Sequence, residues 1–392
     1  MQRRKFIRLA GGGVVAVAAA PLTGCSTDFP AAAVAPWAGP QASTDLRRWA
    51  VAHAILAPNS HNRQPWLVDL RQPDSISLYV DRDRLLPETD PWFRQIVVSQ
   101  GTFVETLALA LHQRGVEPKV ELFPEGEFAP RALDSRPVAR LSWQAGASGA
   151  RPDPLFAQVL RRHTAKVAYD TTRPVTAATL QALAEPAALD GVSFGATVDP
   201  KQVQALRELC LAAARIELNT PRTVLESARL TRVGPSEILQ HRDGISINSW
   251  MPRLASMVGG FDRTQAPAAD STAMKTMVKR FEEHSLTAMG FVWLATPWAR
   301  DLAAGRGRSA EVNAGRAYMR LQLKATELGL QVHPMSQAPQ EFAEMRPHYE
   351  KLHQLLLAQP PGQQVVQMFC RVGYCTDQQH TPRRDPATFL RG

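Results

Sequence analysis

The sequence lacks the short motifs that mark several large classes of enzyme. It contains no G-x-G-x-x-G after a strand and no Walker loop, which are the signatures of Rossmann domains and P-loop NTPases. It also contains no H-E-x-x-H, no Cys/His zinc spacing and no G-x-S-x-G nucleophile elbow. These absences argue against zinc hydrolases and α/β-hydrolases, and we expect no metal site.

Cysteine is scarce, with only 4 in 392 residues. Without Cys25, which belongs to the N-terminal signal described below, the odd number that remains (Cys210, Cys370 and Cys375) does not indicate a disulfide framework. The alternation in "VVQMFCRVGYC" predicts a strand, on which Cys370 and Cys375 would face opposite sides. We therefore interpret these cysteines as small buried hydrophobic residues.

The formal net charge is +9, yet no dense Lys/Arg stripe with interleaved aromatic residues occurs. Nucleic acid is therefore not an expected partner. A basic excess also suits a phosphate-bearing small molecule. The length and the 44% hydrophobic content are sufficient for one large or two ordinary domains.

The N-terminus, residues 1–25, has the layout of an export signal. It has a basic start, a short Gly/Ala-rich apolar run and small residues before Cys25, with no acid in residues 1–24. Arg3-Arg4 followed by "KFI" resembles a bacterial twin-arginine signal, the alternative being an ordinary secretory signal. "LTGC" resembles a lipobox that would anchor Cys25 to the membrane by a lipid, the alternative being a chance cysteine. We predict contact with the twin-arginine export machinery and a location in the bacterial periplasm or on the outer face of the cytoplasmic membrane.

Composition divides the rest of the chain. Residues 26–42 are Ala/Pro-rich and predict a tether. Folded sequence should start near Ser43, the expected N-cap of a helix over 44–56, followed by a strand at "SISLYVDR". A second Gly/Ala/Pro-rich stretch, 143–154, predicts a linker between two halves.

An internal repeat spans this linker. The segments 101–116 and 315–330 both begin with Gly, carry another Gly fourteen positions later and have Leu at the same two inner positions. Each predicts an amphipathic helix whose last Gly adopts the left-handed conformation. Two related α+β units packed together would explain the repeat and would place a ligand cleft between them.

Four segments are candidates for chemistry. The loop "APNSHNRQPW" (57–66) offers amide and hydroxyl groups beside a tryptophan, which suits the edge of a flat heteroaromatic ring or, alternatively, a structural cap for the preceding helix. "RRHTAKVAYD" (161–170) concentrates cations and a hydroxyl, as a phosphate monoester requires, unless it is a solvated basic turn. The arginine pair in "TPRRDP" and the loop 334–337, which presents backbone N–H groups, complete the set.

Together these segments resemble the FMN-dependent nitroreductase superfamily, in particular its fused, Acg-type members. "APNSHNRQPW" is similar to the family loop A-P-S-x-x-N-x-Q-P-W, with Asn59 where Ser is common. "RHTAKVAYD" is similar to the family's phosphate motif, with Thr164 in place of Ser and one extra residue before Tyr169. "ELGLQVHPM" resembles the helix and flavin-adjacent loop, and "TPRR" resembles the C-terminal K-x-R segment with its two basic residues adjacent.

The resemblance implies an α+β, nitroreductase-like fold in which two tandem related halves, 43–145 and 150–392, pack as an intramolecular pseudo-dimer. The chain would be a monomer of this kind or a homodimer. One FMN would lie between the loop of the first half and the phosphate motif of the second.

The resemblance also assigns binding residues. Pro58, Asn59, Ser60 and Asn62 would contact the isoalloxazine, with Gln64 in the same loop. Arg162, His163, Thr164, Arg383 and Arg384 would hold the phosphate. Lys166 would lie near the polar edge of the ring, and Ser336 and Gln337 would place backbone donors near its N5 atom.

The expected function is that of an exported FMN-dependent oxidoreductase. It would carry two electrons from a reduced donor to a small-molecule acceptor such as a nitroaromatic or a quinone. Because the flavin supplies this chemistry, no catalytic side chain is nominated. The alternatives are a flavin-storage protein with little turnover and a dehalogenase or flavin-fragmenting relative. Residues 244–265 would form a lid over the substrate, the alternative being a surface insertion.

Overall fold

The computed structural model describes residues 27–40, 45–146, 148–250, 252–253, 262–297, 307–358 and 363–391. The predicted signal 1–25, including Cys25, lies outside these residues, so export and lipidation stay predictions. Within the described ranges, no helix has the length and apolar character needed to cross a bilayer.

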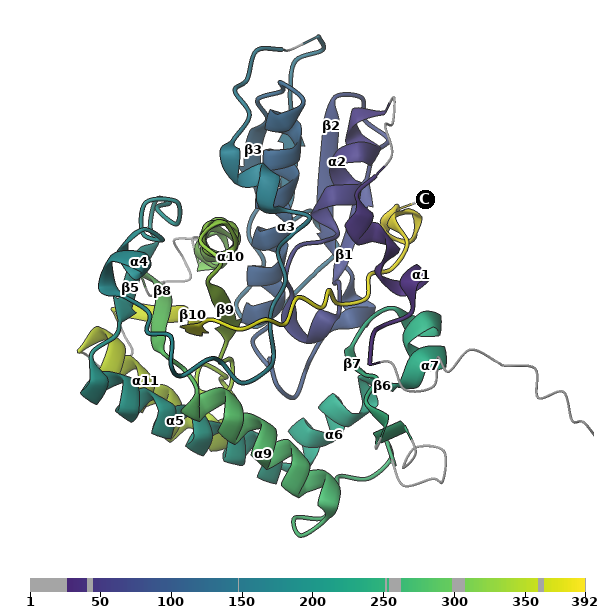
Figure 1. The fold of residues 1–392 in the computed structure, drawn as a ribbon. Coiled ribbons are helices and arrows are strands. Elements are labelled where there is room, and N and C mark those ends of the chain that lie inside the picture. Colours follow the sequence, from purple (N-terminus) through teal and green to yellow (C-terminus); the bar gives the residue numbers. More distant parts are fainter. Residues whose placement is uncertain are drawn as a thin grey trace, which may run out of the picture.

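Two four-stranded antiparallel sheets form the framework of the molecule (Figure 1). The first has the strand order β1-β2-β4-β3, and the second has the order β5-β8-β10-β9. All strands of the first sheet precede segment 143–154, and all strands of the second follow it. The predicted α+β class is therefore confirmed. The relation of the two halves, their limits and their packing as a pseudo-dimer stay predictions.

The strands of the two sheets are β1 (Trp66–Asp69), β2 (Ser75–Val80), β3 (Lys119–Leu122), β4 (Ala139–Ser142), β5 (Ser193–Thr197), β8 (Gly290–Pro297), β9 (Gln331–Pro334) and β10 (Gln364–Gly373). A separate parallel pair consists of β6 (Thr231–Val233) and β7 (Ile245–Ile247). The strands predicted at "SISLYVDR" and "VVQMFCRVGYC" are confirmed as β2 and β10.

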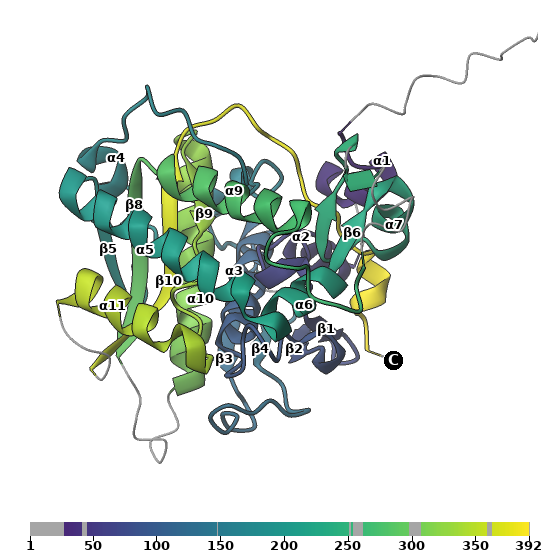
Figure 2. The same cartoon turned by 90° about the horizontal axis from the view of Figure 1, so that it is seen from below.

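Helices cover one face of the first sheet and both faces of the second (Figure 2). The helices are α1 (Ala31–Val34), α2 (Leu46–Ala54), α3 (Arg94–Gln113), α4 (Ala177–Gln181), α5 (Pro200–Asn219), α6 (Pro221–Arg229), α7 (Gly234–His241), α9 (Thr272–Leu286), α10 (Gly307–Glu327) and α11 (Arg346–Leu357). Short 3-10 turns lie at η2 (Ala35–Ala38), η3 (Ser60–Asn62), η4 (Arg82–Arg84), η5 (Pro154–Gln158), η7 (Ala343–Met345) and η8 (Pro386–Phe389).

The two repeat helices pack directly on each other. Helix α3 contains the first repeat segment and α10 the second, and both start several residues before the predicted helices. They touch at Gly101 and Gly315, where a methyl group on either glycine would overlap a backbone carbonyl of the opposite helix, Val312 O or Val98 O. Only glycine permits this approach, because any Cβ would occupy the space of the facing backbone.

Ion pairs between α3 and α10, and the glycines that follow the two helices, also agree with the predicted repeat. Buried Glu105 on α3 accepts from Arg316 Nε and Arg320 Nη1 on α10, each at 2.9 Å. The glycines that close the repeats, Gly115 and Gly329, have φ of +77° and +66°. The left-handed glycine predicted after each helix is therefore confirmed.

The predicted tether is wrong for its described part. Within 26–42, residues 31–38 fold into α1 and η2, and the Trp37 side chain is only 6% exposed. The Trp37 indole N–H donates to Thr381 O at 2.8 Å. The N-cap of α2 is Asp45, whose side chain accepts from Arg47 N and Arg48 N, whereas Ser43 lies outside the described residues.

The C-terminal segment joins the two sheets. From the end of β10 it runs across the molecule toward α1 and the first sheet, as the yellow strand and coil in Figure 1 show. There Leu390 forms a parallel bridge with Val68, and Arg391 N donates to Val68 O at 2.8 Å. This path carries residues 381–384 past the 57–66 loop.

The glycine crossing gives a stability prediction. Gly101→Ala should lower the free energy of unfolding by roughly 1–3 kcal/mol, the usual cost of overpacking a core. The sign is informative, because Gly→Ala in an uncrowded helix raises stability by about 1 kcal/mol. Denaturant unfolding measures the effect, and an unchanged or higher free energy would contradict the close crossing.

Candidate functional site

The 57–66 loop is clamped onto α3. Three hydrogen bonds make the clamp: Thr102 Oγ1 to Pro58 O at 2.7 Å, Gln100 Nε2 to Pro65 O at 2.8 Å, and Trp66 Nε1 to Ser99 O at 3.1 Å. The Trp66 ring is fully buried and packs against Phe103. The tryptophan and the flanking prolines therefore anchor the loop to the helix that carries the glycine crossing.

The backbone of the loop is unusual. His61, Asn62 and Gln64 have φ of 48°, 51° and 52°, in the left-handed region that non-glycine residues rarely adopt. The side chain of Asn59 stabilises this shape, because its Oδ1 accepts from Gln64 N at 2.7 Å. Strained conformations of this kind persist only where surrounding contacts enforce them, and they cluster at functional sites.

A second clamp comes from the segment between α7 and β7. Gly244 N donates to Asn62 O at 3.1 Å, and Gln64 Nε2 donates to Arg242 O at 2.8 Å. Arg63 pairs with buried Asp243 at 3.2 Å. Residues 244–247 are thus part of a clamp and of β7. Residues 251 and 254–261 lie outside the described residues, so the lid stays a prediction.

The side chains of Arg162 and Arg383 meet at Leu56, just before this loop, although they come from distant parts of the chain. Both side chains are 2% exposed, and both donate from Nη2 to Leu56 O, at 3.0 Å and 3.2 Å. Arg383 Nη1 also donates to Asn62 Oδ1 at 2.6 Å. The structure therefore brings the loop, the phosphate motif and the C-terminal segment together, as the sequence predicts.

No acid neutralises these two arginines. Among the described residues, no carboxylate lies within ion-pair distance of either guanidinium, and the Nε of each is buried without a hydrogen-bond partner. Burial lowers the pKa of Arg162 to about 10, and burial together with the charge of Arg162 holds the pKa of Arg383 well below its usual value. Buried charges normally have a partner, so this pair indicates a site for an anion.

The ring of Trp37 lies against the guanidinium groups of both Arg162 and Arg383. Its ring lies 5.4 Å from the Arg162 guanidinium carbon and 5.1 Å from that of Arg383. His380 stacks on the same ring at 4.2 Å. No motif marks Trp37 in the sequence, because its segment has the Ala/Pro-rich composition of a tether.

Lys166 and Thr164 lie in the same motif as Arg162. Thr164 Oγ1 is 3.5 Å from Arg162 Nη1, and the Lys166 side chain is exposed. Desolvation, Arg280 and then Arg383 lower the pKa of Lys166 to about 8.

Other predicted residues are placed differently. Both ring nitrogens of His163 lie against carbonyl oxygens, Asp377 O and Arg161 O. The Arg384 guanidinium points away from Arg162, since its Nη2 donates to Gln64 O at 2.9 Å and it lies over the Phe389 ring. Neither side chain joins the anion site in this structure.

Ser336 and Gln337 follow β9 and are partly exposed. Gln337 O accepts from Gln340 N at 3.0 Å, so a turn follows β9 here. The Ser60 backbone N–H donates to Ser99 Oγ at 3.2 Å, and its hydroxyl donates to Gln95 Oε1 at 3.0 Å. Ser60 is therefore engaged with α3.

Two further polar residues, His61 and Glu217, are not among the predicted site residues. His61 lies in the 57–66 loop, with Ser60 Oγ and Ser227 Oγ each 3.3 Å from one ring nitrogen. Glu217 on α5 is 5% exposed and accepts from Gln340 Nε2 at 2.7 Å. Burial raises the pKa of Glu217 to about 7 against the hydrogen bonds from Gln340 and Gln337. No motif marks either residue, because their neighbours come from distant segments.

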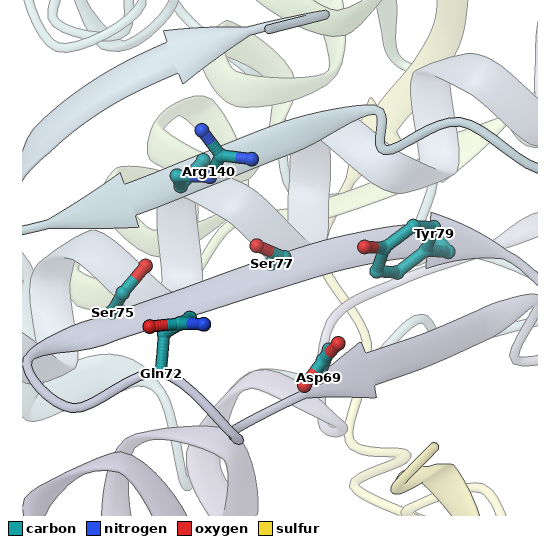
Figure 3. A pocket seen from close by; sticks show the side chains of 6 residues that line it. All are labelled: Asp69, Gln72, Ser75, Ser77, Tyr79 and Arg140. Atoms are coloured by element: carbon teal, nitrogen blue, oxygen red, sulfur yellow. The ribbon is translucent and has the colours of Figure 1, made fainter. Parts of the chain in front are cut away.

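A polar hollow lies on the open face of the first sheet (Figure 3). Its lining residues are Asp69, Gln72, Ser75, Ser77, Tyr79 and Arg140. The alternation along β1 and β2 directs Trp66 and Leu78 to the opposite face, toward α3. The hollow is therefore separate from the Arg162–Arg383 pair.

Comparison with known proteins identifies homologues. The chain is 28% identical over 296 residues to "Putative NAD(P)H nitroreductase Rv3131" of Mycobacterium tuberculosis, covering 75% of this chain and 76% of that protein. It is 33% identical over 82 residues to "Putative NAD(P)H nitroreductase acg" of the same organism, covering 21% of this chain and 24% of that protein. The chain is homologous to these putative NAD(P)H nitroreductases.

The superfamily-level resemblance found in the sequence is thereby confirmed, and the chain is an oxidoreductase of the nitroreductase type. No protein-family model matches the chain. A solved nitroreductase with bound FMN from Bacteroides fragilis aligns with 59% of this chain and 94% of its own, at 15% identity and a TM-score of 0.32.

The buried carboxyl Glu217 gives a pH prediction. A raised pKa means that the folded state binds the proton more tightly, so this stabilisation is present at low pH and is lost as the pH rises toward 7. The shift from 4.5 to about 7 corresponds to roughly 3 kcal/mol. Unfolding measured between pH 5 and 8 should show a smaller fall in stability for Glu217→Gln than for the wild type.

Glu208→Gln is the control, because Glu208 is exposed on the same helix. It should keep the pH dependence of the wild type. If Glu217→Gln also keeps that dependence, Glu217 does not carry a raised pKa.

Proposed function

We propose that the chain is an FMN-dependent oxidoreductase that transfers two electrons from a reduced donor to a nitroaromatic, a quinone or a similar acceptor. The observation that carries the proposal is the meeting of Arg162 and Arg383 under the 57–66 loop, without any acid partner among the described residues. The homologous proteins named as NAD(P)H nitroreductases support the reaction class.

The donors at this site fit a phosphate monoester. Each guanidinium keeps a buried Nε–H without a partner, and Arg162 directs only Nη1 and Nη2 to protein oxygens. Charge-assisted hydrogen bonds from arginine to phosphate are among the stronger ones in proteins. An FMN phosphate would supply both the missing acceptors and the missing negative charge.

The residues of the chain would have separate roles. Arg162, Thr164 and Arg383 would hold the phosphate, and Trp37 would exclude water from behind the two arginines. The 57–66 loop, clamped to α3, would present its backbone to the ring system. FMN, when bound, supplies a carrier that accepts two electrons from a donor and delivers them to an acceptor.

Lys166 would lie beside the ring. Lys166 is exposed and belongs to the same motif as Arg162, and its pKa is lowered by burial, by Arg280 and by Arg383. A cation at that position favours negative charge on whatever binds there. Ser336 and Gln337 remain the residues proposed to offer backbone donors from the loop after β9.

We also propose that the enzyme acts outside the cytoplasm. The twin-arginine-like start of the sequence supports this, because that pathway carries proteins that have already folded around a cofactor. Lipid attachment at Cys25 would keep the enzyme at the membrane. A fusion of the N-terminal 40 residues to a reporter tests this proposal, if the reporter is active only after export. The substitution Arg3-Arg4→Lys-Lys should retain the reporter in the cytoplasm.

The phosphate role gives a binding prediction. Arg162→Ala should weaken FMN binding by about 1.5–3 kcal/mol, the worth of a hydrogen bond to a charged group. Flavin fluorescence titration of the chain from residue 26 onward measures the dissociation constant, and circular dichroism verifies the fold of the variant.

Arg161→Ala is the matched control. Arg161 precedes Arg162 in the chain, but its side chain is exposed and donates to Gln158 Oε1 on the surface. It should bind FMN as the wild type does. If the wild type and both variants bind FMN with equal affinity, Arg162 does not hold the phosphate. If the wild type takes up no FMN, the proposed cofactor is wrong.

Turnover gives a separate prediction. The FMN-loaded protein, mixed anaerobically with NADH or NADPH, should lose the visible absorbance of its oxidised flavin, as expected for flavin reduction. Adding a nitroaromatic or a quinone should restore the absorbance. If a nicotinamide or dithionite reduces the flavin but neither acceptor reoxidises it, the protein is a flavin holder and the proposed oxidoreductase activity is wrong.

A further inference from the structure

A second group of cations surrounds Lys166. The carbonyl oxygen of Lys166 lies 3.0 Å from His284 Nε2 on α9. Arg280 is four residues earlier on this helix, so its side chain lies on the same face of α9 as His284. Burial and then the charge of Arg280 lower the pKa of Lys166, and burial, Arg371 and then Arg280 lower the pKa of His284, which agrees with this placement.

The elements behind Lys166 add further positive charge. Arg371 on β10 is fully buried and donates to Val167 O at 2.7 Å and to His284 O at 2.9 Å. Its Nε donates to His333 Nδ1 at 3.0 Å, which requires this histidine nitrogen to be unprotonated. Arg371 is thus committed to the protein, and its charge adds to that of Lys166 and Arg280.

No acid balances the exposed pair. Among the described residues, neither Lys166 nor Arg280 has a carboxylate within ion-pair distance. Glu283 on α9 is the acid that acts on Arg280, and it does not form an ion pair with it. Two cations that repel each other without an intervening acid favour the binding of an anion between them.

Accessibility distinguishes this pair from Arg162 and Arg383. The Lys166 side chain is exposed and that of Arg280 is partly exposed, whereas Arg162 and Arg383 are 2% exposed. A ligand that enters and leaves during turnover needs accessible charges such as those of Lys166 and Arg280. Buried charges such as those of Arg162 and Arg383 suit a permanently held group.

We propose that Lys166 and Arg280 form a substrate subsite that binds an anionic group, a carboxylate or a phosphate, on a molecule that reacts beside the FMN. The proposal rests on the proposed function and adds a substrate class to it. The anionic group belongs either to the acceptor, as in an aromatic carboxylate, or to the phosphates of a dinucleotide donor.

Paired substrates of equal size test the charge preference. With FMN-loaded protein and NADH, Arg280→Gln should raise the KM for 4-nitrobenzoate roughly tenfold, the loss of one charge-assisted contact. The KM for neutral 4-nitrobenzamide should stay the same, and Arg280→Lys should restore most of the preference. If the KM for NADPH rises instead of that for 4-nitrobenzoate, the subsite holds and serves the phosphate of the donor.

Lys279→Gln is the matched control. It removes one positive charge from the neighbouring position of α9, where the residue is exposed. An equal rise in KM for Lys279→Gln would mean that only the overall charge matters and would overturn the subsite. A tenfold loss of FMN affinity in Arg280→Gln would place Arg280 in the cofactor site and would also overturn it.

Calorimetry gives a readout that does not need turnover. Benzoate should bind the wild type more tightly than benzamide, and Arg280→Gln should abolish the difference. If the wild type shows no such difference, the subsite is refuted even when FMN binds and neutral nitroaromatics are reduced. If FMN does not bind, the proposed function fails, and the benzoate measurement on the protein without FMN still decides the subsite.

Discussion

The contact between Gly101 on α3 and Gly315 on α10 is the constraint on which the candidate site depends. The backbones of the two helices touch there, so neither helix can slide or rotate without a clash. Helix α3 carries the clamp for the 57–66 loop through Ser99, Gln100 and Thr102. Helix α10 leads directly into β9 and the loop with Ser336 and Gln337. The crossing therefore sets the distance between two loops that lie far apart in the sequence.

Electrostatics gives the site its chemical character. Removing a charged group from water is costly, and a buried ion usually has a partner. Arg162 and Arg383 instead donate to backbone carbonyls, face the ring of Trp37 and have no acid nearby among the described residues. Carbonyl dipoles and an aromatic face offset part of the cost, but they leave the net charge. A pair of this kind is stable when an anion completes it, which is why the site suits a phosphate better than a neutral ligand.

Much of this arrangement could be predicted from the sequence, and the exceptions have a common cause. The repeat glycines, the strands at "SISLYVDR" and "VVQMFCRVGYC" and the meeting of the loop with Arg162 and Arg383 follow from local patterns or from the family resemblance. The tether was wrong because the burial of Trp37 depends on Thr381, 344 positions away. Arg384 follows Arg383 in sequence but points elsewhere, because adjacent residues in an extended segment face opposite sides. His61 and Glu217 have partners on distant helices that no sequence window contains.

The 57–66 loop has many polar side chains, and most of them are used to hold its own shape. Asn59 accepts from Gln64 N, Asn62 bonds to Pro382 O and Arg383, and Gln64 bonds to Arg242 O and Arg384 N. An amide at position 59, where the family has a hydroxyl, is therefore compatible with the loop, since its oxygen supports the strained turn. A ligand beside this loop would therefore contact mainly backbone groups and His61. Discrimination between ligands must then come from outside the loop, and the accessible charges at Lys166 and Arg280 are the groups placed to provide it.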